Sequence, residues 1–249
     1  MSVGLVQLGF LASLLAGAAT GLGAVPIFFL RNLSQRTLDV MLGFAAGVML
    51  AATAFSLLIP AMELSSVWIV VIGFLAGGIF VHLLDRYVPH EHLIRGFEGH
   101  PAKLSKVTLL ILAITIHNFP EGLAVGVTFG SGDIAAGMVI AIAIGLQNIP
   151  EGSAVAFPLI REGISRKRAS WYATLSGLVE PIGGLIGVLV ISLMHSLLSV
   201  GLAFAAGAMA FVVSDEMIPE SHRMGHEREA TFGFILGFIV MMFLDTIFG

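Results

Sequence analysis

Eight apolar stretches, each long enough to cross a bilayer, constrain this chain more than any other feature of its sequence. A helix needs about 20 apolar residues to span the hydrocarbon core, so each stretch predicts one transmembrane helix. With 57% hydrophobic residues, 11% charged residues and a mean hydropathy of +0.99, the chain is too apolar for a water-soluble domain. We therefore expect an all-α polytopic membrane protein that forms one transmembrane domain over residues 1–249. The predicted spans lie near 3–30, 38–60, 67–85, 107–129, 134–160, 170–194, 197–218 and 230–248.

Every basic residue falls in a connection that follows an odd-numbered span. This segregation supports the count of eight spans and, by the positive-inside rule, predicts that both termini lie outside the cytoplasm, most simply in a bacterial cytoplasmic (inner) membrane. A net charge of −4 gives no reason to expect a nucleic-acid partner, and the absence of cysteine excludes thiolate metal sites. The basic residues are Arg31, Arg36, Arg86, Arg95, Lys103, Lys106, Arg161, Arg166, Lys167, Arg168, Arg223 and Arg228.

The sequence also contains an internal repeat. Residues 44–49 of span 2 (FAAGVM) return as residues 204–209 of span 7 (FAAGAM), and the same offset of 160 aligns span 3 with span 8. Because five spans separate the members of each pair, matched helices cross the membrane in opposite directions, as in the inverted repeats of secondary transporters. We expect one repeat unit over about 3–85 and another over about 170–248, with spans 4 and 5 (about 107–160) between them as a hairpin. Close packing of the small residues is the alternative explanation of these motifs.

Two related polar motifs occupy the middle of spans 4 and 5. Span 4 contains residues 117–122 (HNFPEG) and span 5 contains residues 147–152 (QNIPEG). Positions i, i+1 and i+4 of a helix share a face, so each motif presents a carboxylate beside two other candidate ligands. Span 6 adds an acidic residue before a proline, close to the centre of its run. The candidate ligands are His117, Asn118, Glu121, Gln147, Asn148, Glu151 and Glu180.

Three carboxylates at one depth in a bilayer need compensation. A charged side chain at the bilayer centre costs about 2.5–3.5 kcal/mol, and no Lys or Arg lies at this level of the spans. A bound divalent cation supplies the missing charge, and imidazole, carboxylate and amide ligands suit Zn²⁺, Fe²⁺ or Mn²⁺. The alternative is that these side chains only hydrogen-bond spans 4, 5 and 6 together. Met49, taken alone, is better explained as core filler.

These motifs resemble the ZIP (Zrt-, Irt-like protein) family of divalent-metal transporters, most closely its bacterial GufA-type branch. The resemblance covers nearly the whole chain, including residues 44–49, Glu180-Pro181, residues 214–220 and the Phe243-Leu244-Asp245 ending. It implies a 3+2+3 bundle in which spans 4 and 5 lie between the two repeat units and hold a two-metal site.

The resemblance also assigns roles to individual residues. One metal position would use Met49, His117, Glu121, Gln147 and Glu151. The other would use Asn118, Glu121, Asn148, Glu151 and Glu180. Many relatives carry His where Gln147 stands, and some carry Asp where Asn148 stands, so the second position is expected to be the weaker one. Entry and release routes would be marked by Asp39, Glu63, Asp85, Asp215, Glu216 and Asp245, of which Asp215 and Glu216 are also costly on an apolar helix and therefore favour a place on the exit path.

The predicted function is secondary transport of divalent metal cations into the cytoplasm, with zinc as the leading substrate and iron, manganese and cadmium as others, by rocking of one repeat unit against the central helices. A second class, the intramembrane metalloprotease, needs a His-Glu-x-x-His helix that the sequence lacks. A metal-sensing membrane protein would bind metal without flux. No organic cofactor is expected, and a homodimer is one candidate assembly. Two further polar groups could collect metal or simply be solvated loops: His90, His92 and His100, and Glu220, His222, His226 and Glu227.

Overall fold

The computed structural model describes residues 3–30, 32–92, 96–100 and 106–248. Within these residues, eight helical segments are long and apolar enough to cross a membrane, so the predicted count of spans is confirmed. The segments cover Gly4–Phe28, Gln35–Leu64, Val67–Tyr87, Ile111–Gly130, Ile134–Arg161, Arg166–Leu193, His195–Ser221 and Glu227–Phe248.

Several spans are built from more than one helix. Spans 1 to 3 comprise α1 (Val3–Gly23) with the 3₁₀ turn η1 (Val25–Phe28), then α2 (Gln35–Ala52), η2 (Thr53–Leu58) and α3 (Ile59–Leu64), then α4 (Val67–Tyr87). Spans 4 and 5 are α5 (Lys106–Gly130) and α6 (Ile134–Arg161). Spans 6 to 8 comprise α7 (Arg166–Gly177) and α8 (Glu180–Leu193), then η3 (His195–Leu197), α9 (Leu198–Val212), η4 (Val213–Met217) and α10 (Ile218–Ser221), then α11 (Glu227–Phe248).

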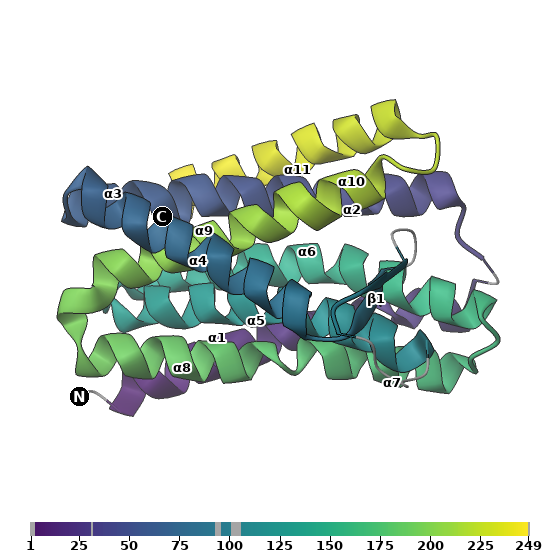
Figure 1. Ribbon diagram of the computed structural model, residues 1–249, viewed down its shortest axis with the longest axis horizontal. Coiled ribbons are helices and arrows are strands. Elements are labelled where there is room, and N and C mark those ends of the chain that lie inside the picture. The colour runs from purple at the N-terminus through teal and green to yellow at the C-terminus, as the bar shows by residue number, and fades with distance from the viewer. Residues whose placement is uncertain (1–2, 31, 93–95, 101–105, 249) are drawn as a thin grey trace.

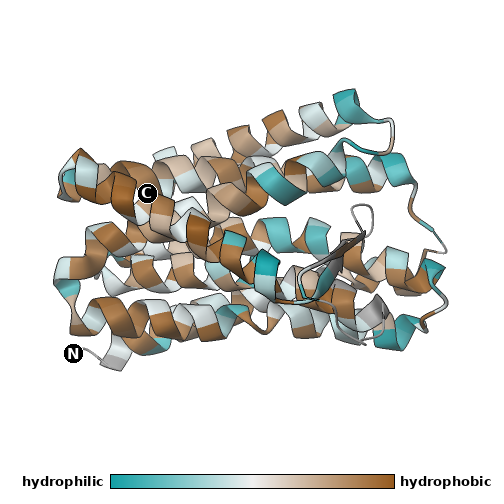
Figure 2. Ribbon diagram, in the orientation of Figure 1, coloured by the Kyte–Doolittle hydropathy of each residue, from teal (hydrophilic) through white to brown (hydrophobic). Residues whose placement is uncertain are grey.

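The two chain ends lie toward the same end of the bundle, as an even number of spans requires (Figure 1). The turn between α5 and α6 is as tight as predicted. Gly132 adopts a positive φ of 92°, and Asp133 caps α6 by accepting a hydrogen bond from the Ala136 backbone N–H at 3.0 Å. The polar connections after spans 1, 5 and 7 gather at the opposite end, and apolar residues predominate along the helices, with a few polar turns among them (Figure 2).

The helices pack in two groups of four spans. In one group α1 packs against α6, and α5 packs against α8; in the other α2 packs against α11, and α4 packs against α9. Glycines bring the backbones together within each group: a Cβ on Gly152 would overlap the Thr20 carbonyl of α1, and one on Gly47 would overlap the Phe234 carbonyl of α11. The groups meet through α2 with α6 and α5 with α9, and α5 and α6 lie in the middle of the bundle (Figure 1).

Three spans depart from regular α-helix near their polar residues. Spans 2 and 7 each contain a π-helical turn, η2 and η4, followed at once by a proline, Pro60 or Pro219. Such turns recur at functional sites in helices. Span 6 is broken at Leu178 and Val179, so that Glu180 and Pro181 begin α8. The break places Pro181 in the first turn of α8, where a residue without a backbone N–H is tolerated.

One short hairpin was not predicted. Strand β1 (His90–His92) pairs antiparallel with β2 (Gly96–Glu98), with His90 opposite Glu98. The alternating polar pattern there is too short to have been distinguished from a loop. The fold is otherwise helical over the described residues, as expected.

Candidate metal centre

The three predicted carboxylates converge inside the bundle from three helices. Glu121 on α5 and Glu180 on α8 are fully buried, and Glu151 on α6 is 8% exposed. Each is close enough to the others to repel them electrostatically. All twelve Lys and Arg residues lie near the ends of spans or in connections, so this concentration of negative charge has no basic counterpart at its own depth.

His117 lies on the same helix as Glu121 but pairs with a residue of another span. Its Nε2 contacts the Glu216 carboxylate of η4, and it also interacts electrostatically with Glu151 and Asp85. The imidazole therefore lies between the midplane carboxylates and two acidic groups on spans 7 and 3. The motif on α5 thus reaches both groups of spans.

The two motif asparagines are both fully buried but differ in their contacts. Asn148 Nδ2 donates to the Ala16 carbonyl of α1 at 2.8 Å and to Glu180 Oε1 at 2.6 Å. Among the described residues, neither amide atom of Asn118 has a hydrogen-bond partner, and neither do Asn148 Oδ1, Glu151 Oε1 and Glu180 Oε2. Buried polar atoms are normally paired, so these atoms are available to a ligand.

The remaining predicted ligands are also in the interior. Gln147 is fully buried on α6, and its amide approaches the Glu121 carboxylate. Met49 is fully buried at the end of α2, where its carbonyl accepts a hydrogen bond from Thr53 Oγ1 at 2.8 Å. Its position in the hydrophobic core is compatible with either of the two roles considered for it.

The ligands are not arranged as a closed metal site. In the part of the chain that the structure describes, no three His, Asp or Glu side chains form a group that could hold a metal ion. Two features account for this: His117 is engaged with Glu216, and three of the seven midplane candidates are amides. The assignment of the metal ligands therefore stays a prediction.

Two polar pairs lie on opposite sides of the midplane. Near the C-terminal end of α11, Asp245 Oδ1 accepts a hydrogen bond from Ser56 Oγ at 2.6 Å. The repeat offset of 160 aligns Ser56 with Glu216 and Asp245 with Asp85. Glu216 and Asp85 are the two acidic neighbours of His117 on spans 7 and 3. The internal repeat thus places one polar pair on each side of the buried carboxylates, the outer pair on spans 2 and 8 and the inner pair on spans 7 and 3.

The other predicted pathway residues lie nearer the ends of the bundle. Asp39 is fully buried on α2 and accepts a hydrogen bond from Gln35 Nε2. Its Oδ2 lies 2.8 Å from His226 Nδ1. Glu63 is exposed on α3, and Asp215 is partly buried on η4. Neither of these two is brought to the midplane.

The loop histidines have specific contacts where they are described. His90 is fully buried, with Nδ1 2.8 Å from the Val88 carbonyl and Nε2 4.0 Å from Asp85 Oδ1. His90 thus lies beside the inner acidic pair, whereas His100 stacks on Tyr87. The side chain of His92 lies outside the described residues.

The residues after span 7 are likewise engaged where contacts are recorded. His222 bridges to Thr231 at 3.0 Å, and His226 contacts Asp39 as above. Glu220 is partly buried on α10 and Glu227 begins α11. These contacts tie the start of α11 to its neighbours.

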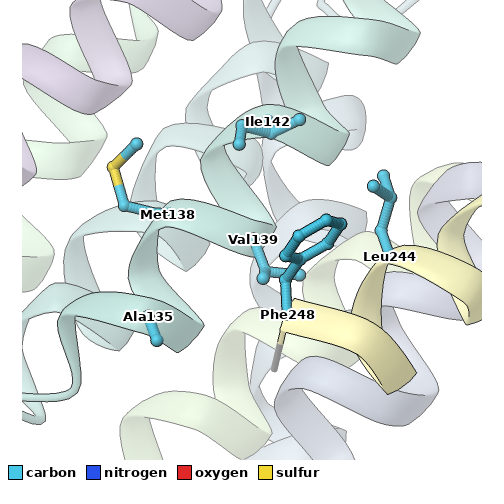
Figure 3. A pocket seen from close by; sticks show the side chains of 6 residues that line it. All are labelled: Ala135, Met138, Val139, Ile142, Leu244 and Phe248. Carbon is cyan, nitrogen blue, oxygen red and sulfur yellow. The ribbon is translucent and has the colours of Figure 1, made fainter.

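A hollow of about 290 Å³ between α6 and α11 does not serve the metal (Figure 3). Its lining is apolar and presents carbon and one thioether rather than the nitrogen and oxygen ligands that a borderline dication prefers. The lining residues are Ala135, Met138, Val139, Ile142, Leu244 and Phe248.

Sequence reasoning missed two arrangements at the centre. It placed Glu216 on an exit path but did not pair it with His117, and it assigned no role to Ser56. The repeat contained a signal for both, because the offset of 160 aligns Ser56 with Glu216 and Asp85 with Asp245.

Comparison with known proteins gives a consistent result. Residues 95–245 match the family model described as ZIP Zinc transporter. The chain is 48% identical over 251 residues to the zinc transporter GufA of Myxococcus xanthus, an alignment that covers 97% of this chain and 99% of that protein. It is 45% identical to the zinc transporter ZIPB of Bordetella bronchiseptica (93% and 78% covered) and 37% identical to the zinc transporter ZIP11 of Homo sapiens (91% and 93% covered).

Proposed function

Because the chain belongs to the ZIP family, we propose that it moves divalent metal cations, zinc foremost, across the membrane in which its eight helices are embedded. The family and the relatives are transporters, so the protein is not an enzyme. The observation that carries the proposal is the set of three buried carboxylates, Glu121, Glu151 and Glu180, which lack a Lys or Arg partner among the described residues. A passing dication offsets most of their negative charge.

The site is suited to transient binding. Conduction requires ligands that attract the ion but release it, and amide oxygens beside carboxylates bind a borderline dication less tightly than a closed His and Cys cage. The primary position is proposed to use Met49, His117, Glu121, Gln147 and Glu151. Asn118, Asn148 and Glu180 belong to the second, weaker position that the family resemblance implies. Iron, manganese and cadmium are proposed as further substrates.

The two polar pairs suggest the route. An ion from the outer end would meet Asp245 and Ser56, pass the midplane carboxylates, and leave past His117, Glu216 and Asp85. Because these last three interact electrostatically, the ion can exchange one ligand for the next without crossing a purely apolar stretch. The positive-inside rule supports termini outside the cytoplasm, with a bacterial inner membrane as the proposed location. The proposed direction of movement is into the cytoplasm.

The packing favours a particular division of the moving parts. We expected a repeat unit, such as 3–85, to rock as one body, but α1 of that unit packs on α6 and α8 whereas α2 packs on α11. Glycine-mediated backbone contacts occur inside each group of four spans. Contacts recorded between the groups involve side chains, such as the rings of Phe80 and Phe119 with centroids 5.9 Å apart. The proposal is therefore that the group of α1, α5, α6 and α8, which carries every proposed ligand except Met49, shifts against the other group.

Flux distinguishes this function from metal sensing. The purified full chain, reconstituted in liposomes loaded with a zinc-sensitive dye, is expected to admit zinc faster than empty liposomes, and to admit iron, manganese and cadmium in a panel of dications. Binding of zinc by the purified protein without any increase in uptake for any cation would support a sensor and refute transport.

A further inference from the structure

One hydrogen-bonded side chain joins three helices at the centre of the bundle. Asn148 of α6 is fully buried, and its Nδ2 donates to the Ala16 carbonyl of α1 and to Glu180 Oε1 of α8. A backbone carbonyl can only accept, so the amide nitrogen must face Ala16, and the orientation of the amide is determined. Its Oδ1 then points elsewhere and has no partner among the described residues.

The equivalent residue of the other motif is placed differently. Asn118 occupies the same position in the motif of α5, thirty residues earlier, and is equally buried. Neither its Nδ2 nor its Oδ1 has a hydrogen-bond partner in the described part of the chain. The two asparagines therefore share a sequence position but not a role, because only Asn148 is committed to holding other helices.

The bond to Glu180 changes what the centre can bind. One oxygen of Glu180 is engaged at 2.6 Å, so only Oε2 is available to an ion, and Asn148 offers a neutral oxygen rather than a charged one. Glu180 also begins α8, whose N-terminus carries a partial positive charge. Two fixed dipoles thus already stabilise this carboxylate without any metal.

We propose that Asn148 is a positioning residue whose N–H groups stabilise the Glu180 carboxylate, as a second cation otherwise would. The midplane then holds one divalent ion at a time. The inference rests on the proposed function. Glu121, Glu151 and Glu180 supply three negative charges, so one dication leaves a single negative charge, which the amide and the α8 N-terminus stabilise. A second dication would leave a net positive charge facing those same positive dipole ends, which is unfavourable in a low-dielectric interior.

Counting zinc ions tests this directly. The metal-free full chain in detergent is dialysed to equilibrium against zinc, and bound zinc is counted per chain for the wild type and for the Glu121→Ala/Glu151→Ala double variant. The difference between them is the midplane count, because ions bound at the loops are common to both. We expect the wild type to bind one more zinc ion per chain than the double variant. In Asn148→Asp the new carboxylate would repel the Ala16 carbonyl oxygen and the Glu180 carboxylate, which the Asn148 amide now contacts. A second cation would relieve this repulsion, so the midplane count should rise to two.

Matched alanine variants separate positioning from ligation. Asn148→Ala should lower the melting temperature of the metal-free protein by several degrees. Asn118→Ala should leave it within about one degree of the wild type, because the Asn118 amide has no hydrogen-bond partner among the described residues. Should Asn148→Asp fail to fold, Glu180→Gln decides the matter. A midplane count that stays at one supports the inference, and a count that falls by one places an ion at Glu180 and overturns it.

Other results overturn the inference as plainly. Two midplane zinc ions in the wild type would do so, as would a folded Asn148→Asp that still holds one. The count is made without transport, so a protein that binds one midplane zinc but admits none into liposomes would refute the proposed function and leave this inference standing. Equal counts in the wild type and the double variant would overturn the inference.

Discussion

Gly122 provides a sharp test of how the centre is held together. It lies on α5 one residue after Glu121, at the point where α5 meets the start of α8. A Cβ added there would overlap the Glu180 carbonyl oxygen and lie 2.6 Å from the carbonyl carbon and Cα of Glu180. Ordinary Cβ contacts begin near 3.4 Å, and the carbonyl oxygen is the nearest atom, so the two backbones would have to separate by roughly 1.4 Å.

The cost of Gly122→Ala follows from that geometry. Overpacking of a tight contact costs about 1–3 kcal/mol. A shift of α8 by this distance would also stretch the 2.6 Å bond from Asn148 to Glu180, and a hydrogen bond to a charged group contributes about 1.5–3 kcal/mol. We predict a clear fall in melting temperature and a fall in zinc uptake of at least about tenfold, since 1.4 kcal/mol corresponds to a factor of ten.

Gly145 on α6 is the matched control. A Cβ there would lie 3.7 Å from Ala16 Cα and 3.9 Å from Ala19 Cβ, which are ordinary contacts. Gly145→Ala should therefore keep wild-type uptake and gain up to about 0.5–1 kcal/mol of stability from its better helix propensity. Wild-type melting and uptake in Gly122→Ala would show that the close approach of α5 to Glu180 does not matter, and would refute the reasoning.

Two further substitutions test the inner side of the pathway. Glu216→Gln removes the charge that pairs with His117 and should slow zinc uptake in liposomes by about tenfold or more, because a charge-assisted contact contributes about 1.5–3 kcal/mol. The control Asp215→Asn lies on the same turn but is only partly buried, so it should slow uptake less. Equal effects of the two variants would argue against a specific role for Glu216. Asp39→Ala leaves Gln35 and His226 without their buried acceptor, so it should lower the melting temperature and reduce the free energy of unfolding by about 1–3 kcal/mol. Glu63 is exposed, so Glu63→Ala should leave the melting temperature unchanged. An unchanged melting temperature for Asp39→Ala would contradict this prediction.

The spans and the tight hairpin could be predicted because their causes are local. Bilayer thickness sets the length of an apolar run, and a connection of three residues between Gly130 and Ile134 permits only an antiparallel turn. The convergence of Glu121 and Glu151 could be predicted for the same reason. Helical periodicity places each carboxylate on the same face as the other residues of its motif, and the tight turn brings the two helices together.

The breaks and pairings near the centre could not be predicted from one sequence. Glu180-Pro181 is compatible with either a kinked helix or a new one, and only the packing of α8 on α5 selects the break at Leu178 and Val179. The π-helical turns change which side chains face inward, so the contact of Glu216 with His117 depends on a local rotation that periodicity cannot supply. Asn118 and Asn148 are indistinguishable in the motif, and their different contacts arise from helices far away in the sequence.

The central claim is that metal ions cross the membrane through the carboxylates that α5 and α6 bring together. Zinc uptake by liposomes containing the Glu121→Ala/Glu151→Ala double variant, at the same protein density as the wild type, tests it most directly. The claim predicts uptake no faster than in empty liposomes, from a variant that still melts cooperatively. Uptake at the wild-type rate would contradict it, because the ions would then be passing by a route that does not involve these two residues.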